Sequence, residues 1–408
     1  MTGVARMLAE IAHIGADPRG GYARPGYGDA DRELREWFVG HARARGLDVH
    51  RDRNGIVWAW WHPPGSGGPA VVTGSHLDSV PGGGAYDGPL GVASALAAVD
   101  VMRARGDTPA RPIAVGVFPE EEGSRFGLAC LGSRLVSGAV SPERALALTD
   151  REGDTFADAL RRDGLDPRHV GRDDEMLDAI GCFVELHVEQ GRGLIDLGQP
   201  VAIGASILGH GRWRVTVDGQ GNHAGTTLMG DRRDPMVAAA RAVLEIRDIA
   251  RGIPDARATV GRIEPVPGGT NVIASRVSFW IDARHPDDVV TAALIASVRD
   301  AVARVAAAEG CTATLQEESL SPTVDFDRGL RDRMRAALPD APELGTGAGH
   351  DAGVLAERIP TAMLFVRNPT GISHSPEELV EDSDADKGAV ALADALVAVA
   401  GDRTDASV

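Results

Sequence analysis

Short apolar runs alternate with helix-type patterns along most of the chain. The segment 91–105 and the Asp-rich region near 151–180 have the pattern of helices that connect strands. Strands that alternate with helices predict an α/β domain built on a largely parallel sheet. The runs typical of buried strands lie at 55–61, 69–72, 113–118, 182–188 and 361–366.

The segment 29–46 predicts an amphipathic helix near the start of the chain. Apolar side chains, among them Leu34 and Phe38, recur at the spacing of one helix face. Asp29 is placed to cap the start of this helix, and Gly46 is placed to end it.

The pattern changes between 209 and 320. Three segments there alternate apolar and polar residues, as half-exposed strands do, and helix-type segments at 234–252 and 287–310 lie among them. This combination predicts two helices on one face of a small, mostly antiparallel sheet. Because the α/β pattern then resumes, we expect one domain at 1–208 and 321–408, interrupted by an inserted α+β domain at 209–320.

Size and charge narrow the classes of function. A chain of 408 residues exceeds the usual size of one hydrophobic core. The formal net charge of −17 argues against nucleic acid or an anionic membrane as the main partner. No apolar run approaches the length of a membrane span, and the N-terminal segment lacks the pattern of a cleaved signal. Because Cys130, Cys182 and Cys311 lie far apart, we expect neither disulfides nor a thiolate zinc site, and we expect a cytoplasmic protein.

Histidine and carboxylate side chains gather where the predicted strands end. His76 and His187 end two of the strands, Glu120–Glu122 follow a third, and His374 follows the last one after a short loop. Ligands bind outside the carboxyl ends of parallel strands, so we expect these side chains to lie close together. Histidine and carboxylate ligands without thiolates are typical of catalytic metal centres.

The glycine-rich segment 73–91 supplies two further candidates. Asp87 is placed to bridge two divalent ions about 3.5–4 Å apart, a pair that would polarise a carbonyl and activate water. Asp78 is placed to accept the second ring proton of His76. The adjacent Glu121 and Glu122 suit one metal ligand and one general base.

Each of these segments has a simpler interpretation when it is taken singly. The glycine-rich stretch also fits a surface loop, and the three glutamates also fit a solvated acidic turn. A phosphate-binding loop is rejected, because 73–91 has neither a GK[ST] ending nor the GxGxxG spacing.

Seven motifs, taken in order, identify a family. The chain resembles the dinuclear-metal amidohydrolases of the N-carbamoyl-L-amino-acid hydrolase and allantoate amidohydrolase group, within the larger aminoacylase and carboxypeptidase clan. The resemblance extends from about residue 20 to residue 380. The motifs are GSHLDSVPGGGAYDGPLG, FPEEEGSRFG, ELHVEQG, GNHAGTTLM, NVIASRVSFWIDAR, GAGHDA and GISHSPEE.

The resemblance implies a role for each candidate. It implies two divalent ions per subunit, zinc or manganese first and cobalt or nickel as alternatives, with Glu121 as the general base. It implies an inserted domain that acts as a lid and forms a homodimer interface. His350 supports the site without direct chemistry. The implied metal ligands are His76 and His187 on one ion, Glu122 and His374 on the other, and Asp87 between them; the implied substrate contacts are Gln190, His223, Asn271, Arg284 and Gly371.

These implications predict hydrolysis of the ureido C–N bond of a small carboxylate, with release of ammonia and carbon dioxide. His223 would donate to the oxyanion, and the Arg284 guanidinium would hold the substrate carboxylate in bidentate fashion. The sequence FVRNPT before the last motif favours allantoate, as does the wording of the first motif. The alternatives are an N-carbamoyl-L-amino acid, N-carbamoyl-β-alanine (a β-ureidopropionase), an amide bond as in aminoacylases and dipeptidases, and a non-catalytic ligand-binding protein.

Overall fold

The structure, a computed structural model, describes residues 3–401. The chain forms two compact units, one made of the residues up to 206 and from 325 onward, the other of residues 207–324. These divisions lie close to the expected 208/209 and 320/321. They differ because the link after the last strand of the second unit extends to 324, where the chain rejoins the large sheet through β13 (Val324–Asp325).

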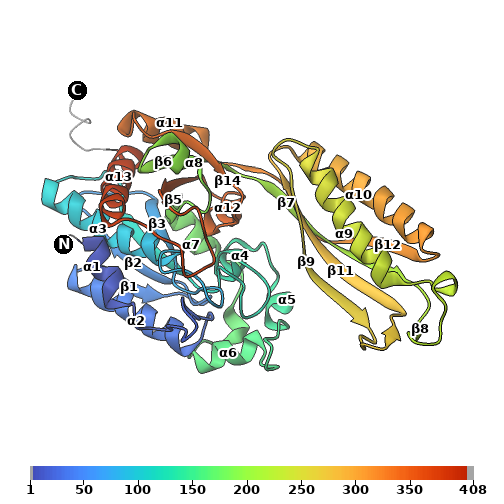
Figure 1. Ribbon diagram of the computed structural model, residues 1–408. Coiled ribbons are helices and arrows are strands. Elements are labelled where there is room, and N and C mark those ends of the chain that lie inside the picture. Colours follow the sequence, from blue (N-terminus) through green and yellow to red (C-terminus); the bar gives the residue numbers. More distant parts are fainter. Residues whose placement is uncertain (1–2, 402–408) are drawn as a thin grey trace. The chain divides into compact units, whose positions relative to one another are not determined.

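The first unit contains a nine-stranded sheet (Figure 1). Its centre is parallel, because β3 pairs with β4 and β5, and β5 pairs with β15. Antiparallel strands continue the sheet on both sides, so the predicted α/β class is confirmed. The strands are β1 (Asp48–Arg51), β2 (Val57–Trp61), β3 (Ala70–His76), β4 (Ile113–Phe118), β5 (Ile180–Val188), β6 (Val201–Ile207), β13, β14 (Glu343–Thr346) and β15 (Thr361–Val366).

Side chains pack on both faces of this sheet, which explains why its central strands are apolar throughout. On one face, Val71 and Val184 join the core formed with α1, α2, α3 and α13. On the other face, the rings of Trp58, Phe118 and Phe183 pack edge to face. The longer helices are α1 (Gly3–Glu10), α2 (Asp29–Ala44), α3 (Pro89–Arg105), α11 (Arg328–Ala337) and α13 (Asp382–Ala400), and the shorter ones are α4 (Leu131–Ser137), α5 (Pro142–Leu146), α8 (Gly193–Leu197) and α12 (Asp351–Leu355).

Two local predictions are wrong. Asp29 does not cap α2; it is the first helical residue, Gly28 holds the cap position, and the Asp29 carboxylate pairs with Arg32. The region 151–180 is not one crossover helix, since glycine and proline divide it. It contains α6 (Phe156–Arg162), a 3₁₀ turn (Pro167–His169) and α7 (Asp174–Ala179).

The second unit is the expected α+β domain. Four antiparallel strands in the order β12-β7-β11-β9 carry helices α9 and α10 on one face (Figure 1). Buried and partly exposed residues alternate along β7 and β11, and the buried set, including Val215 and Phe279, packs against the helices. The elements are β7 (Gly209–Asp218), β8 (Asn222–His223), a 3₁₀ turn (Met229–Asp231), α9 (Pro235–Arg251), β9 (Arg257–Val266), β10 (Val272–Ile273), β11 (Arg276–His285), α10 (Asp288–Ala308) and β12 (Thr312–Ser321).

Candidate metal centre

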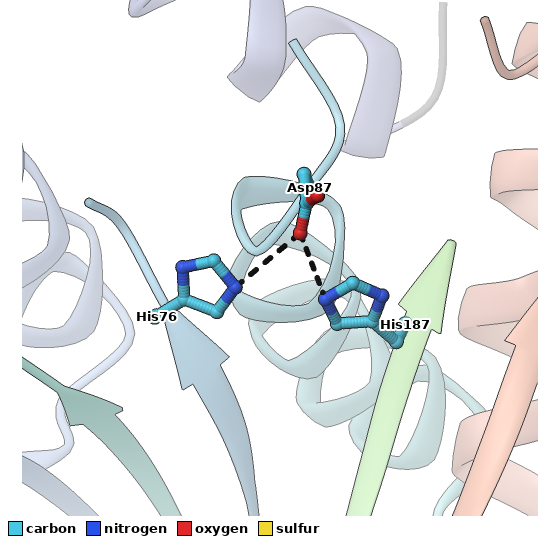
Figure 2. A group of neighbouring side chains, drawn as sticks. All are labelled: His76, Asp87 and His187. Carbon is cyan, nitrogen blue, oxygen red and sulfur yellow. Dashed lines mark ion pairs between the residues drawn. The ribbon is translucent and has the colours of Figure 1, made fainter. Parts of the chain in front are cut away.

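Two buried histidines face one carboxylate oxygen at the end of the parallel strands. His76 is the last residue of β3, His187 lies near the end of β5, and Asp87 lies in the glycine-rich loop before α3. The Nε2 atoms of His76 and His187 lie 3.5 Å and 3.2 Å from Oδ1 of Asp87 (Figure 2). Within residues 3–401, neither Nε2 atom has a hydrogen-bond partner. These three side chains form a group that could hold a metal ion.

The other oxygen of Asp87 faces a second group. Oδ2 of Asp87 lies 3.4 Å from Nε2 of His374, which lies 3.5 Å from Oε2 of Glu122. Glu122 follows β4, and His374 lies in the segment after β15. Asp87, Glu122 and His374 form another group that could hold a metal ion. The Asp87 carboxylate therefore lies between two sets of donors, with one oxygen toward each.

Backbone carbonyls orient the two buried histidines. Nδ1 of His187 lies 2.9 Å from the carbonyl oxygen of Val188, and Nδ1 of His76 lies 3.0 Å from the carbonyl oxygen of Asp78. The Asp78 carboxylate, expected to contact this ring, is farther away at 3.7 Å. It accepts hydrogen bonds from the backbone N–H groups of Glu121 and Glu122, both at 3.1 Å. Asp78 thus links the turn after β4 to His76.

The three consecutive glutamates point in different directions. Glu120 turns away from the donor groups and accepts hydrogen bonds from the backbone N–H groups of Arg125 and Phe126. Oε2 of Glu121 lies 3.6 Å from Nε2 of His76, while its Oε1 accepts a hydrogen bond from the Cys130 thiol at 3.4 Å. Burial raises the pKa of the Glu121 carboxyl well above its usual value.

Burial and neighbouring groups shift the pKa values of several carboxyl groups here. Burial and then the nearby Asp87 raise the pKa of Glu122 to about 8. Burial followed by Glu185 raises the pKa of Asp351 to about 8. Burial also opposes ionisation of Asp87, but His187 and His76 outweigh it and lower the pKa of Asp87 well below its usual value. Imidazole nitrogens together with crowded carboxylates are a donor set that fits divalent cations.

A third group, which the sequence analysis did not identify as a site, shares His187 with the first. Glu185, His187 and His350 also form a possible ligand set. Glu185 is fully buried on β5 and accepts hydrogen bonds from the Ser75 hydroxyl and the Ala352 N–H group. The rings of His350 and His187 lie 4.3 Å apart, and burial lowers the pKa of His350 well below its usual value.

Glu378 supports the loop that carries Asp87, a role that was also missed. Its Oε1 accepts the backbone N–H groups of Tyr86 and Asp87, both at 3.0 Å, and its Oε2 accepts the Ser373 hydroxyl at 3.0 Å. Gln190 donates to Oδ2 of Asp87 at 2.9 Å and to Ser373 at 3.1 Å. In the sequence, the short spacing of four residues between His374 and Glu378 in GISHSPEE could have indicated that Glu378 lies near the candidate site.

The predicted substrate contacts are divided between the two units. Gln190 and Gly371 belong to the first unit, and His223, Asn271 and Arg284 belong to the second. His223 lies exposed on β8, and the Asn271 carbonyl accepts the Ala224 N–H group. At the end of β11, Nε and Nη2 of Arg284 lie 2.7 Å and 3.0 Å from the two carboxylate oxygens of Asp282. This edge of the guanidinium is thus engaged by Asp282.

Comparisons with known proteins agree with the family that the sequence motifs resemble. The profile of the family described as Peptidase family M20/M25/M40 matches residues 72–398. The chain is 36% identical over 397 residues to an N-carbamoyl-L-amino acid amidohydrolase of Geobacillus stearothermophilus, covering 94% of this chain and 95% of that protein. It is 32% identical over 402 residues to the allantoate amidohydrolase of Escherichia coli, covering 96% of each. A hydantoinase/carbamoylase family amidase from Burkholderia multivorans superimposes with a TM-score of 0.84 at 34% identity, covering 96% of each chain.

Proposed function

The chain belongs to peptidase family M20/M25/M40, and from this premise we propose that it hydrolyses the ureido C–N bond of a small carboxylate. Allantoate is the leading substrate, in purine catabolism. An N-carbamoyl-L-amino acid is the second candidate, because the relative at 36% identity is named for that activity. N-carbamoyl-β-alanine remains a further alternative.

One observation supports the metal assignment above all others: the two oxygens of the Asp87 carboxylate face different donor groups. In this proposal Asp87 is shared between two divalent ions, with His76 and His187 on one and Glu122 and His374 on the other. Bound divalent ions of this kind polarise a carbonyl group and lower the pKa of water. Zinc and manganese are the first candidates, with cobalt and nickel as alternatives, because all tolerate imidazole and carboxylate ligands.

Glu121 is the proposed general base. It lies beside His76 but outside the two proposed ligand sets, and its raised pKa suits a group that both accepts and returns a proton. Its carboxylate takes a proton from the attacking water as the ureido carbon is attacked. It then delivers that proton to the leaving nitrogen, and the carbamate product decomposes to ammonia and carbon dioxide.

The second unit supplies the remaining substrate contacts in this proposal. Arg284 holds the substrate carboxylate, His223 donates a hydrogen bond to the developing oxyanion, and Asn271 orients the ureido group. Gln190 and Gly371 line the substrate position in the first unit. The second unit then acts as a lid.

Glu121 also bears on the non-catalytic alternative, because a protein that only binds its ligand would have no use for a general base.

We also place the protein in the cytoplasm as a homodimer formed through the second unit. Edge strand β9 is mostly exposed and carries the exposed apolar side chains Ile263 and Val266, which suits pairing between copies. Cys130, Cys182 and Cys311 are free and buried, as in proteins of reducing compartments. Across residues 3–401, no helix is long and apolar enough to cross a membrane.

The deciding experiment measures ammonia release by purified protein that has been stripped of metal and resupplied with Mn²⁺ or Zn²⁺. Allantoate is compared with N-carbamoyl-L-amino acids, N-carbamoyl-β-alanine and one N-acetyl amino acid. A preference for allantoate supports the leading substrate, and a preference for a carbamoyl amino acid corrects it. Absence of turnover on every compound, with metal bound, would favour the ligand-binding alternative.

A further inference from the structure

A second cavity, of about 580 Å³, lies beside helix α2 and shares no residue with the candidate metal centre. Five arginines and one histidine line it, against two acidic residues, in a chain whose net charge is −17. Basic side chains therefore outnumber acidic ones in this lining, whereas acidic residues outnumber basic ones in the chain as a whole. The basic residues are Arg32, Arg35, Arg43, His50, Arg51 and Arg162.

The wall of this cavity already holds one carboxylate. Nη1 of Arg35 and Nη1 of Arg51 each lie 3.0 Å from the same oxygen of Asp163. Arg35 is 5% exposed, also pairs with Asp31, and has an Nε atom without a hydrogen-bond partner in the described part of the chain. Two guanidinium groups converging on one oxygen show that this wall stabilises an anion.

One arginine at the open side of the cavity has no charged partner among the described residues. Arg32 pairs with Asp29 and Arg162 with Asp154, but Arg43 makes no ion pair or side-chain hydrogen bond with any residue between 3 and 401. A Cβ atom added at Gly40, one helical turn before Arg43, would meet no atom within 4 Å. Gly40 is exposed, and the space beside it is open.

We propose that this cavity binds a small anion with two or more phosphate or carboxylate groups. Guanidinium forks match both groups, and the volume lies within the range of about 300–1,000 Å³ usual for small-molecule sites. Apart from the charged residues and His50, the lining is valine and glycine, so it offers no Phe, Tyr or Trp ring on which a nucleobase could stack. The expected ligand is thus a compact, non-aromatic polyanion.

The test is calorimetric titration of the metal-loaded full chain with fructose 1,6-bisphosphate and, separately, tricarballylate at fixed ionic strength. We expect saturable binding, with the tighter probe showing whether phosphate or carboxylate is preferred. Arg43→Gln should weaken binding at least tenfold, and Gly40→Phe should abolish it by filling the cavity. Arg144→Gln, which removes an exposed arginine of the same unit, should leave the affinity unchanged.

Three results would overturn the proposal. The first is an absence of saturable binding of both probes. The second is unchanged binding by Arg43→Gln, an exposed position where folding is not at risk, since the anion would then lie elsewhere, for instance at the metal centre. The third is equal weakening by Arg144→Gln, which would indicate general charge attraction.

Discussion

Glu121 differs from its neighbours in what it contacts, and its replacement should separate metal binding from turnover. In Glu121→Gln the proposed ligands remain, but the amide cannot accept a proton. Turnover should fall by about 100- to 10,000-fold, the range typical of general acid–base catalysis. Metal content measured by mass spectrometry should stay at the wild-type level, whereas Glu122→Gln should lose metal. Undiminished turnover of Glu121→Gln would exclude the general-base role.

Glu378 should matter for metal affinity although it faces neither donor group directly. In Glu378→Gln, one amide oxygen can still accept backbone N–H groups, but the Ser373 hydroxyl loses the shorter of its two acceptors and keeps only Oδ2 of Asp87, at 3.4 Å. The loop with Asp87 should then be held less firmly, and the affinity for metal should fall by about tenfold, the low end for residues that position ligands. Competition with a fluorescent chelator measures this affinity without any assay of activity. Glu377→Gln is the matched control, because Glu377 is exposed; equal affinities in both variants would contradict the role.

Arg284 tests substrate recognition. Arg284→Lys replaces a planar fork by a point charge, so kcat/KM for a carboxylate substrate should fall by about tenfold or more. The loss should be much smaller for the corresponding substrate amide, which lacks the charge that the fork holds. If both substrates lose equally, Arg284 acts on the fold of β11 through Asp282 and not on the substrate.

Among the strands, β3 and β4 approach so closely that one glycine is required. Gly74 has φ +146° and lies opposite Gly116, whose carbonyl oxygen is 1.9 Å from an added Cβ atom. Gly74→Ala should therefore lower the free energy of unfolding by about 3 kcal/mol and displace His76 two residues later. Urea unfolding measures the loss.

Gly40→Ala is the control for this substitution. Gly40 lies inside α2 with open space around an added Cβ atom, so alanine should raise the free energy of unfolding by up to about 1 kcal/mol. Gly74→Ala should therefore lower the free energy of unfolding, and Gly40→Ala should raise it. If Gly74→Ala unfolded at the same urea concentration as the wild type, β3 and β4 could move apart without loss of stability, and the prediction would be wrong.

For the protein as a whole, stability should depend on pH and metal together. Burial raises the pKa values of Glu122 and Asp351 to about 8, far above those of the unfolded chain. A raised carboxyl pKa contributes stability below the unfolded value near pH 4, and this contribution is lost as pH rises toward 8. Divalent metal should offset the part of the loss that comes from Glu122, because it binds the ionised Glu122 carboxylate.

The increase in melting temperature on adding Mn²⁺ should therefore be larger at pH 8 than at pH 6. Differential scanning calorimetry of metal-stripped and metal-loaded protein, in buffers of equal ionic strength, measures this difference. An equal increase at both pH values would contradict it.

The order of apolar runs was sufficient to predict the α/β class and the inserted α+β domain, and to place the candidates His76, His187, Glu120–Glu122 and His374 at strand ends. Asp87 came from the glycine-rich segment, and the choice of Glu122 as a ligand came from the family resemblance. Local periodicity carries that information, because buried strands and amphipathic helices require particular spacings of apolar residues. The course of the chain within 151–180 was not predictable in this way, since short helices broken by glycine and proline have no sustained period.

Contacts between distant segments depended on the three-dimensional structure. Three features of the site could not be read from the sequence: the two Asp87 oxygens face separate donor groups, a backbone carbonyl is the partner of His76, and Glu378 supports the loop with Asp87. These contacts join residues up to 292 positions apart. The cavity beside α2 likewise joins α2, β1 and the end of α6. Such contacts follow from how strands and loops pack, and no local pattern in the chain encodes which side chain turns toward which.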